Sequence, residues 1–179
     1  MKKILSLILI VCVLLSTISL TGCSEKETSE VFFKEYQTLS YTDFNNIVSN
    51  LGYTPVENTD NSQFEFNRSF FISDEDTGLT LLFFEAETPD MCYLYFNQLV
   101  LAYENFTADY ATMKRYNNIG LYTLVDEGVI IYIAFVENTI LASVTYMKDP
   151  SKGEEIGAEL EKLVTALEYP AFEYHVKGE

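Results

Sequence analysis

Apolar side chains recur three and four positions apart in three parts of the chain, which is the spacing of one face of a helix. These parts span about residues 42–51, 88–105 and 151–168. Each is predicted to form a helix whose apolar side packs on a core. The second is the longest.

Residues that favour helix ends bound these three stretches. Ser40 or Thr42 can cap the first helix, and Thr88 can cap the second. The third opens on residues 151–154, Ser-Lys-Gly-Glu, which has the S-x-x-E pattern of a capping box. We therefore expect the third helix to begin at this box and to stop before Pro170.

Five shorter stretches are rich in apolar, aromatic and β-branched residues, which is typical of strands. They span about residues 66–73, 79–86, 120–125, 129–136 and 139–147. Asp, Asn and Gly residues, which favour turns, separate neighbouring stretches, so strands close in sequence should pair antiparallel. Residues 54–62 are expected to be a loop and residues 169–179 a tail.

The predicted order of elements is α-β-β-α-β-β-β-α. Runs of strands separated by helices indicate the α+β class. We expect an antiparallel sheet of about five strands, with the helices packed mainly on one face. Residues 40–179 would then form a single globular domain.

The turn at Glu137 and Asn138 determines which residues face each other in the hairpin around it. If these two residues alone form the turn, Phe135 lies opposite Ile140. Every second residue along each strand, counted from this pair, then points to the same side of the hairpin as Phe135 and Ile140. That side is wholly apolar and is expected to lie against the helices. The other side pairs Ile130 with Thr145, Tyr132 with Ser143, and Ala134 with Leu141.

The second side of this hairpin mixes apolar and polar side chains and carries a tyrosine, a composition that suits a contact surface. We expect part of it to bind an envelope protein or a second copy of the chain. The alternative is that the chain covers this side itself, through residues 31–36 or through Phe172 and Tyr174. The predicted contact residues are Ile130, Tyr132, Leu141, Ser143 and Thr145.

The N-terminal residues have the features of a secretory signal. Two lysines precede an apolar stretch, residues 4–20, which leads into Leu20-Thr21-Gly22-Cys23. The alternative is an uncleaved membrane anchor, because the apolar stretch reaches the lower length limit of a spanning helix. The small Gly22 directly before Cys23 favours the cleaved signal.

Residues 1–23 resemble the bacterial lipoprotein class. The resemblance implies removal of residues 1–22, a diacylglycerol on Cys23 with acyl chains such as palmitate, and a place at the cell membrane, facing outside the cytoplasm. One acyl chain anchors a protein only weakly, whereas two anchor it stably. Residues 23–39 would be the tether between lipid and domain.

The chain is strongly acidic, with a formal net charge of −16. Removal of Lys2 and Lys3 with the signal would make the charge more negative by two. A surface of this sign repels phosphate backbones and anionic lipid headgroups, so we expect no binding to nucleic acid.

Few residues are candidates for chemistry, and we expect no catalytic, metal-binding or cofactor-binding site. Cys12 belongs to the signal and Cys23 takes the lipid, so Cys92 has no disulfide partner. Its place on the apolar side of a helix predicts a buried thiol. His175, the only histidine, falls in the predicted tail. Residues 74–78, Asp-Glu-Asp-Thr-Gly, match a calcium loop only in part and are predicted to be a turn.

Together these patterns predict a membrane-tethered lipoprotein that acts through protein contacts, as an interaction or accessory module of the cell envelope. The alternative is a small-ligand binding module with an aromatic-lined pocket between sheet and helices, because the chain has 13 Tyr and 13 Phe. A third reading is a carboxylate-based enzyme, for which the chain shows no recognisable motif.

Overall fold

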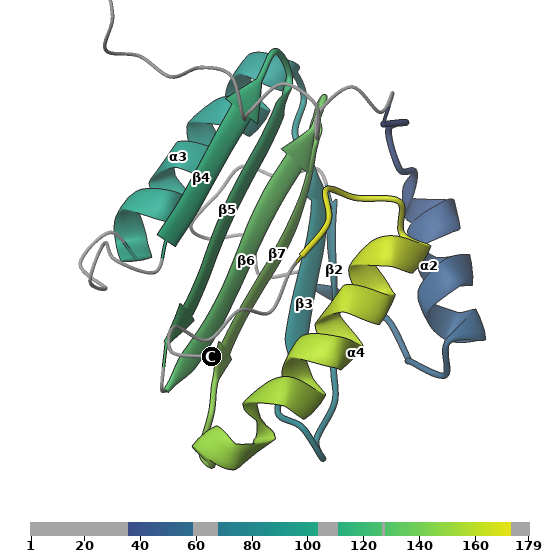
Figure 1. Ribbon diagram of the computed structural model, residues 1–179. Coiled ribbons are helices and arrows are strands. Elements are labelled where there is room, and N and C mark those ends of the chain that lie inside the picture. The colour runs from purple at the N-terminus through teal and green to yellow at the C-terminus, as the bar shows by residue number, and fades with distance from the viewer. Residues whose placement is uncertain (1–35, 59–67, 104–110, 127, 173–179) are drawn as a thin grey trace, which may run out of the picture. The chain divides into compact units, whose positions relative to one another are not determined.

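Seven antiparallel strands form one sheet in the order β1-β2-β3-β7-β6-β5-β4 (Figure 1). The computed structural model describes residues 36–58, 68–103, 111–126 and 128–172, all within one unit, Glu35–Glu179. The strands are β1 (Val56–Asn58), β2 (Arg68–Ser73), β3 (Thr80–Glu85), β4 (Ala111–Tyr116), β5 (Ile119–Asp126), β6 (Val129–Val136) and β7 (Thr139–Tyr146). The helices are α2 (Tyr41–Asn50), α3 (Pro89–Tyr103) and α4 (Gly153–Ala166), with a short 3₁₀ helix, η2 (Pro150–Lys152), before α4.

The α+β class and the antiparallel sheet are confirmed, but the sheet is larger than the five strands predicted. The described residues include two further strands, β1 and β4. β1 lies in the predicted loop at residues 54–62 and pairs with β2. β4 has the largely polar sequence Ala-Thr-Met-Lys-Arg-Tyr and pairs along its whole length with β5. Both are edge strands, which are held by the hydrogen bonds of one neighbour more than by burial.

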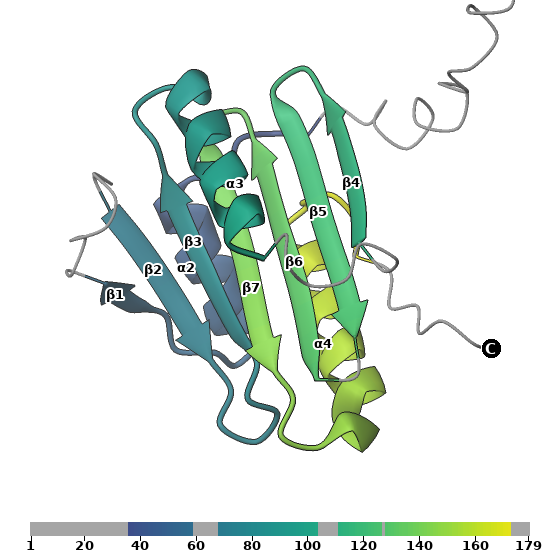
Figure 2. The same cartoon turned by 90° about the vertical axis from the view of Figure 1, so that its left-hand side faces the viewer.

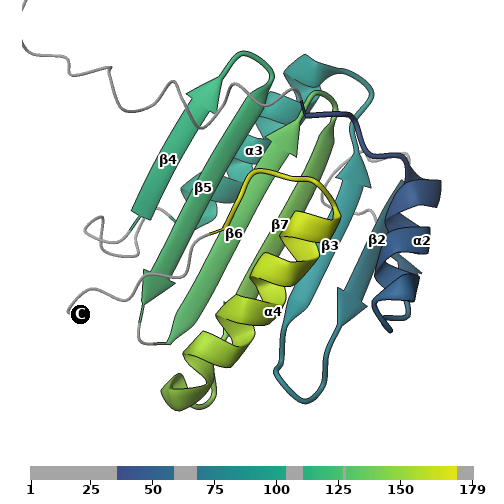
Figure 3. The same ribbon diagram turned by 45° about the vertical axis from the view of Figure 1, so that its right-hand side comes forward.

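Helices cover both faces of the sheet, which corrects the prediction of helices mainly on one face. α3 lies on one face, and α2 and α4 lie on the other (Figures 2 and 3). The central strands explain why, since β6 is apolar along its whole length and buried at every position. A strand that is apolar on both sides requires cover on both faces of its sheet.

The chain crosses the sheet between β3 and β4. β3 lies in the middle of the sheet, α3 carries the chain over one face, and β4 begins at the far edge (Figure 2). From there β4, β5, β6 and β7 follow one another as neighbours. The last of them pairs with β3, with Leu82 opposite Ala142 and Glu85 opposite Thr139.

Aromatic side chains fill the space beneath the helices on both faces. On the α3 side, the ring of Phe96 lies 4.9 Å from the ring of Phe135 in β6, measured between centres. On the opposite face, Phe44 of α2 stacks on Phe83 of β3 at 4.7 Å. All four side chains are buried. Such pairs stabilise the core beyond the area that they bury.

The first two helices begin at predicted caps. The hydroxyl of Ser40 accepts a hydrogen bond from the backbone N–H of Asp43 at 3.1 Å. The hydroxyl of Thr88 accepts one from the backbone N–H of Met91 at 3.2 Å. Each bond satisfies one of the backbone N–H groups that a helix start leaves unpaired.

The third helix begins differently from its prediction. The carboxylate of Asp149 accepts hydrogen bonds from the backbone N–H and the hydroxyl of Ser151, at 3.0 and 2.8 Å, and thereby caps η2. α4 follows with Lys152 at its N-cap and no side-chain cap bond. The predicted capping box of residues 151–154 is therefore wrong, because Ser151 already belongs to the preceding 3₁₀ turn.

Candidate functional site

The hairpin of β6 and β7 has the predicted register. Glu137 and Asn138 form the turn, Phe135 lies opposite Ile140, and Tyr132 lies opposite Ser143. The wholly apolar side of this hairpin packs beneath α3. Both sides of the hairpin are therefore composed as the sequence predicted.

The mixed side of the hairpin is interior, which corrects its prediction as a contact surface. The five predicted contact residues are each at most 1% exposed: Ile130, Tyr132, Leu141, Ser143 and Thr145. α4 lies over this face, and residues 167–172 cross it beyond the end of α4 (Figure 3). Phe172 places its ring edge-on to Tyr132, with centres 6.0 Å apart. The alternative of cover by the chain itself holds, so these five side chains are core residues of the folded domain.

Hydrogen bonds satisfy the polar groups of this buried face. The hydroxyl of Tyr132 donates to the carbonyl of Pro170 at 2.7 Å. The hydroxyl of Tyr169 donates to the hydroxyl oxygen of Thr139 at 2.6 Å, and Thr139 donates to the carbonyl of Val136 at 2.9 Å. Burial raises the pKa of both tyrosines, so both stay protonated and serve as donors.

These contacts place part of the predicted tail in the core. Tyr169 and Phe172 are 4% and 1% exposed, because they lie against Thr139 and Tyr132 of the sheet. Residues 173–179, with His175, lie outside the described residues. So do residues 1–35, with Cys23.

Cys92 is the buried thiol that the sequence predicted. It lies on the side of α3 that packs on the sheet, beside Phe96 and Phe135. Burial, and then the negative charge of Glu137, raise the pKa of the thiol to about 12. A reactive cysteine needs an accessible, electropositive surrounding that favours the thiolate. Cys92 is therefore a packing residue.

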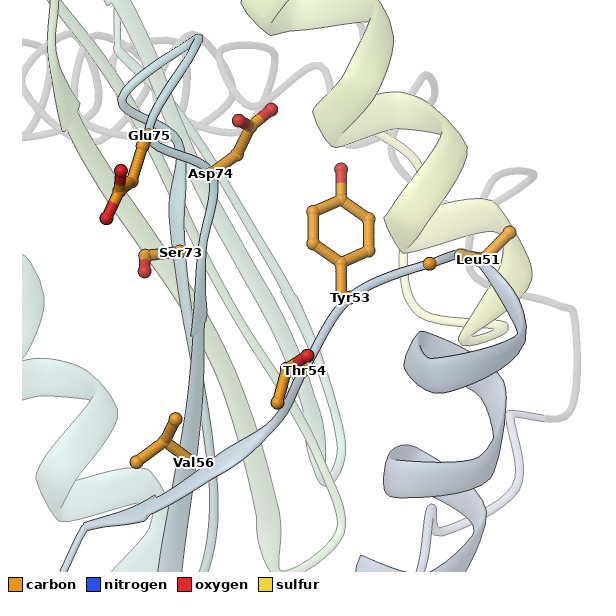
Figure 4. A pocket seen from close by; sticks show the side chains of 8 residues that line it. Leu51, Tyr53, Thr54, Val56, Ser73, Asp74 and Glu75 are labelled. Atoms are coloured by element: carbon orange, nitrogen blue, oxygen red, sulfur yellow. The ribbon is translucent and has the colours of Figure 1, made fainter.

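An open hollow of about 510 Å³ lies between the loop that follows α2 and the end of β2 (Figure 4). Among the described residues that line it, Tyr53 alone is aromatic. The hydroxyl of Tyr53 donates a hydrogen bond to Glu159 of α4, and burial and then this bond raise the pKa of Tyr53. Asp74 points toward the same side of the hollow as this hydroxyl. The hollow is a polar surface depression and differs from the aromatic-lined pocket of the ligand-binding alternative.

Residues 74–78 form the predicted turn. One carboxylate oxygen of Asp74 accepts from the backbone N–H of Asp76 at 2.9 Å, and the other accepts from the hydroxyl of Thr77 at 2.9 Å. These bonds hold the pKa of Asp74 below its usual value. Gly78 closes the turn with φ of 76°. Within the described ranges, no group of three or more His, Cys, Asp and Glu side chains is placed to hold a metal ion.

Exposed apolar side chains lie at separate places on the α3 side of the sheet. The large apolar side chains exposed in the described parts are Val56, Leu94, Leu101, Met113 and Tyr146. Residues that lie opposite one another on neighbouring strands form a row across this face, which passes through Leu82 and Ile133. Val56 on β1 is at one end of this row and Met113 on β4 is at the other. Tyr146 shares this side because it lies four residues from Ala142, which packs beneath α3.

The two leucines lie on the outer side of α3. Leu94 is 53% exposed and Leu101 is 59% exposed, whereas Cys92 and Phe96 face the sheet. α3 carries one charged residue, Asp90, among its 15 residues. A surface helix normally places charged residues on its outer side, and α4 does so with a run of glutamates. The outer side of α3 with its flanking exposed residues is called the α3 surface below.

A cation lies at one flank of the α3 surface. The guanidinium of Arg115 on β4 stacks over the ring of Tyr93, 3.6 Å from its centre. The apolar spacing of this helix predicted the side that packs on the core and did not reveal its uncharged outer side. The available signal was the absence of any charged residue after Asp90 in Pro89–Tyr103.

Comparisons with known proteins give no family assignment. No family model matches the chain, and no curated protein matches it. Among solved structures, a GTP-binding regulator from Thermotoga maritima is similar, with a TM-score of 0.44 and 14% sequence identity, over 74% of this chain and 90% of that chain. This similarity is too distant to bear on function. None of the helices in the described ranges has the length and apolar character needed to cross a membrane.

Proposed function

We propose that the protein is a lipoprotein held at the outer side of the cell membrane by a diacylglycerol on Cys23. Its folded domain would act as a protein-interaction or accessory module of the cell envelope. The tether is supported by Leu20-Thr21-Gly22-Cys23 after a charged and then apolar N-terminus. Interaction is supported by the α3 surface.

The α3 surface is the observation that carries the interaction role. Exposed leucines on a helix with one charged residue leave apolar area in contact with water. A surface helix normally carries charged residues on its outer side, so an outer side without them suits contact with another protein surface. Tyrosine and arginine at its flank are residue types enriched in protein–protein interfaces.

The tether is tested by processing of the full chain in a bacterial host. We expect mass spectrometry of membrane-extracted protein to show loss of residues 1–22 and an added diacylglycerol. Cys23→Ala should abolish labelling by a fatty-acid probe and release the protein from the membrane fraction. Cys92→Ala is the matched control and should leave both unchanged. An intact chain that retains Met1 in the membrane fraction would contradict the tether.

The interaction role is tested by cross-linking in intact cells. The wild-type chain should form defined cross-linked species that disappear when Leu94 and Leu101 are both changed to glutamate. Ala158→Glu, on the exposed side of α4, is the control and should leave the species unchanged. Cross-linked species that survive in the double variant would show that contacts do not use the α3 surface.

A further inference from the structure

Four positions on the outer side of α3, beside the exposed Asp90 and Ala102, form a pattern that reads the same in both directions. Leu94, Asn97, Gln98 and Leu101 follow one another at helical spacing along it. In order they are leucine, amide, amide, leucine. When two copies of a helix pack antiparallel across a two-fold axis, each position of one copy meets the position of the other copy that comes in reverse order. A symmetric dimer interface of this kind therefore suits a pattern that is unchanged by reversal.

We propose, on the basis of the interaction role above, that the partner of the α3 surface is a second copy of this chain. The two α3 helices pack antiparallel across a two-fold axis near Asn97 and Gln98. Leu94 of each copy then meets Leu101 of the other at both ends of the contact. The central amides can donate and accept hydrogen bonds across the axis, so the polar centre is satisfied without charge.

Charge favours this surface over the rest of the molecule. Two copies of a chain with a formal net charge of −16 repel each other over most approaches. The repulsion is smallest where charges are fewest, and α3 carries only Asp90. α3 also lacks the Lys and Arg side chains that attach an amphipathic helix to an anionic lipid surface. A second protein surface of the same uncharged kind fits this helix better than a membrane does.

The position of Asp90 favours the antiparallel arrangement. Asp90 lies in the first turn of α3, where a negative charge is stabilised by the helix dipole. In an antiparallel pair the two Asp90 side chains lie at opposite ends of the contact. A parallel pair would place both carboxylates side by side and align the two helix dipoles unfavourably.

The proposed tether makes a small interface sufficient. A stable dimer in solution usually buries about 800 Å² on each partner, whereas the proposed contact is confined to one helix of each copy and its flanking residues. Chains anchored in one membrane are confined to a thin layer, which raises the effective concentration of each for the other. Pairing would therefore be reversible and would depend on the density of the protein in the membrane.

The closing experiment uses the full chain, processed in bacterial membranes, with one added thiol. Gln98→Cys places a thiol near the two-fold axis, while Cys23 carries the lipid and Cys92 is fully buried. A short bis-maleimide should convert this variant to a covalent dimer on a denaturing gel. Ala158→Cys, on the exposed side of α4, is the control for random collisions at equal density. Equal dimer yields from the two variants would overturn the proposal.

Charge exchange tests the antiparallel pairing itself. In the Gln98→Cys background, Leu94→Glu and Leu101→Lys should each lose the dimer, and the two changes together should restore it. Restoration is expected because the acidic side chain at 94 then lies opposite the lysine at 101 of the other copy. Resistance to proteolysis checks that each variant folds. Loss of the dimer without restoration would overturn the antiparallel arrangement.

The outcomes also separate this proposal from the broader interaction role. An adduct with a different protein that is lost in Leu94→Glu would retain the α3 surface as a contact site and overturn self-pairing. No adduct of any kind would overturn both. The distribution of the same variants between membrane and soluble fractions reports separately on the tether.

Discussion

At the scale of single residues, two tyrosine hydroxyls hold the segment after α4 on the sheet. Tyr132 donates to the carbonyl of Pro170, and both groups are buried. Tyr132→Phe should lower the free energy of unfolding by about 1–3 kcal/mol, since the carbonyl loses its donor inside the core. Urea unfolding measures this. Tyr146→Phe, at a side chain 62% exposed, should change stability little, and an equal loss in both variants would contradict the role of the bond.

Cys92 gives a prediction about alkaline pH. The thiol ionises near its ordinary pKa of 9.0 in the unfolded chain, whereas burial raises its pKa to about 12 in the folded chain. Between these values the unfolded chain binds fewer protons than the folded chain, so the free energy of unfolding should fall as pH rises. Cys92→Ala should be less stable at neutral pH but should lose less stability above pH 9. Parallel pH profiles for the two proteins would contradict the buried thiol.

Residue-level predictions from the sequence succeeded where local geometry decides. The register of the β6–β7 hairpin followed from its two-residue turn, because strand pairing extends directly from a tight turn. Burial of Tyr132 could not be predicted in the same way. It depends on Pro170 and Phe172, which come later in the chain and reach Tyr132 only in the folded domain.

At the scale of elements, β5 and β6 meet at a glycine. Gly120 lies opposite Phe135, and an added Cβ would lie 2.2 Å from the Cε1 atom of the Phe135 ring. Phe96 packs on the same ring, which restricts its movement. Gly120→Ala should therefore lower the free energy of unfolding by about 1–3 kcal/mol through overpacking. Urea unfolding of the variant measures this loss.

Two further variants control this prediction. Gly128→Ala should have little effect, because an added Cβ there meets no atom within 4 Å. The double variant Phe135→Leu with Gly120→Ala should lose less free energy of unfolding than the sum of the losses in the two single variants. The reason is that the smaller leucine side chain leaves room for the added Cβ at position 120. Equal effects of alanine at positions 120 and 128 would show that the ring moves aside freely.

The elements that the sequence predicted are those with strong periodicity or clear caps. α2, α3 and the strands β2, β3, β5, β6 and β7 lie within a few residues of their predicted bounds. β1 and β4 were missed because each is short or polar and exists through pairing with a neighbour. The start of α4 was misplaced because two competing caps, Asp149 and Ser151, lie two residues apart.

At the scale of the whole molecule, net charge opposes the compact state. Two ion pairs, Arg68–Glu57 and Lys162–Glu159, lie at the surface of the described ranges, where such pairs stabilise a fold little. Raising sodium chloride from about 0.01 M to about 1 M shortens the screening length from about 30 Å to about 3 Å. The free energy of unfolding should rise as self-repulsion is screened.

Urea unfolding at several salt concentrations measures this gain. Glu161→Lys, at an exposed position of α4, makes the net charge less negative by two and should reduce the gain. Stability that falls with salt would show that attractive pairs outweigh the net repulsion.

The arrangement of the whole sheet was beyond the sequence patterns. α3 lies in the crossover between β3 and β4, and β4 is far from β3 in the sheet because β3 pairs with β7. Pairing between strands so distant in the chain leaves no mark on local periodicity. The α3 surface was missed for a different reason, because its evidence was the absence of charged residues rather than the presence of a motif.

The place of β7 sets the order in which the chain can fold. β7 is the last of the described strands to be synthesised, yet it lies between β3 and β6. Until it is available, the sheet made by β1, β2 and β3 has no neighbour to join and no α4 to cover it. Joining strands so far apart in sequence is slow, because a long loop must close first. The central sheet is therefore completed only when the segment that holds β7 and α4, near the C-terminal end of the described residues, is free to join it.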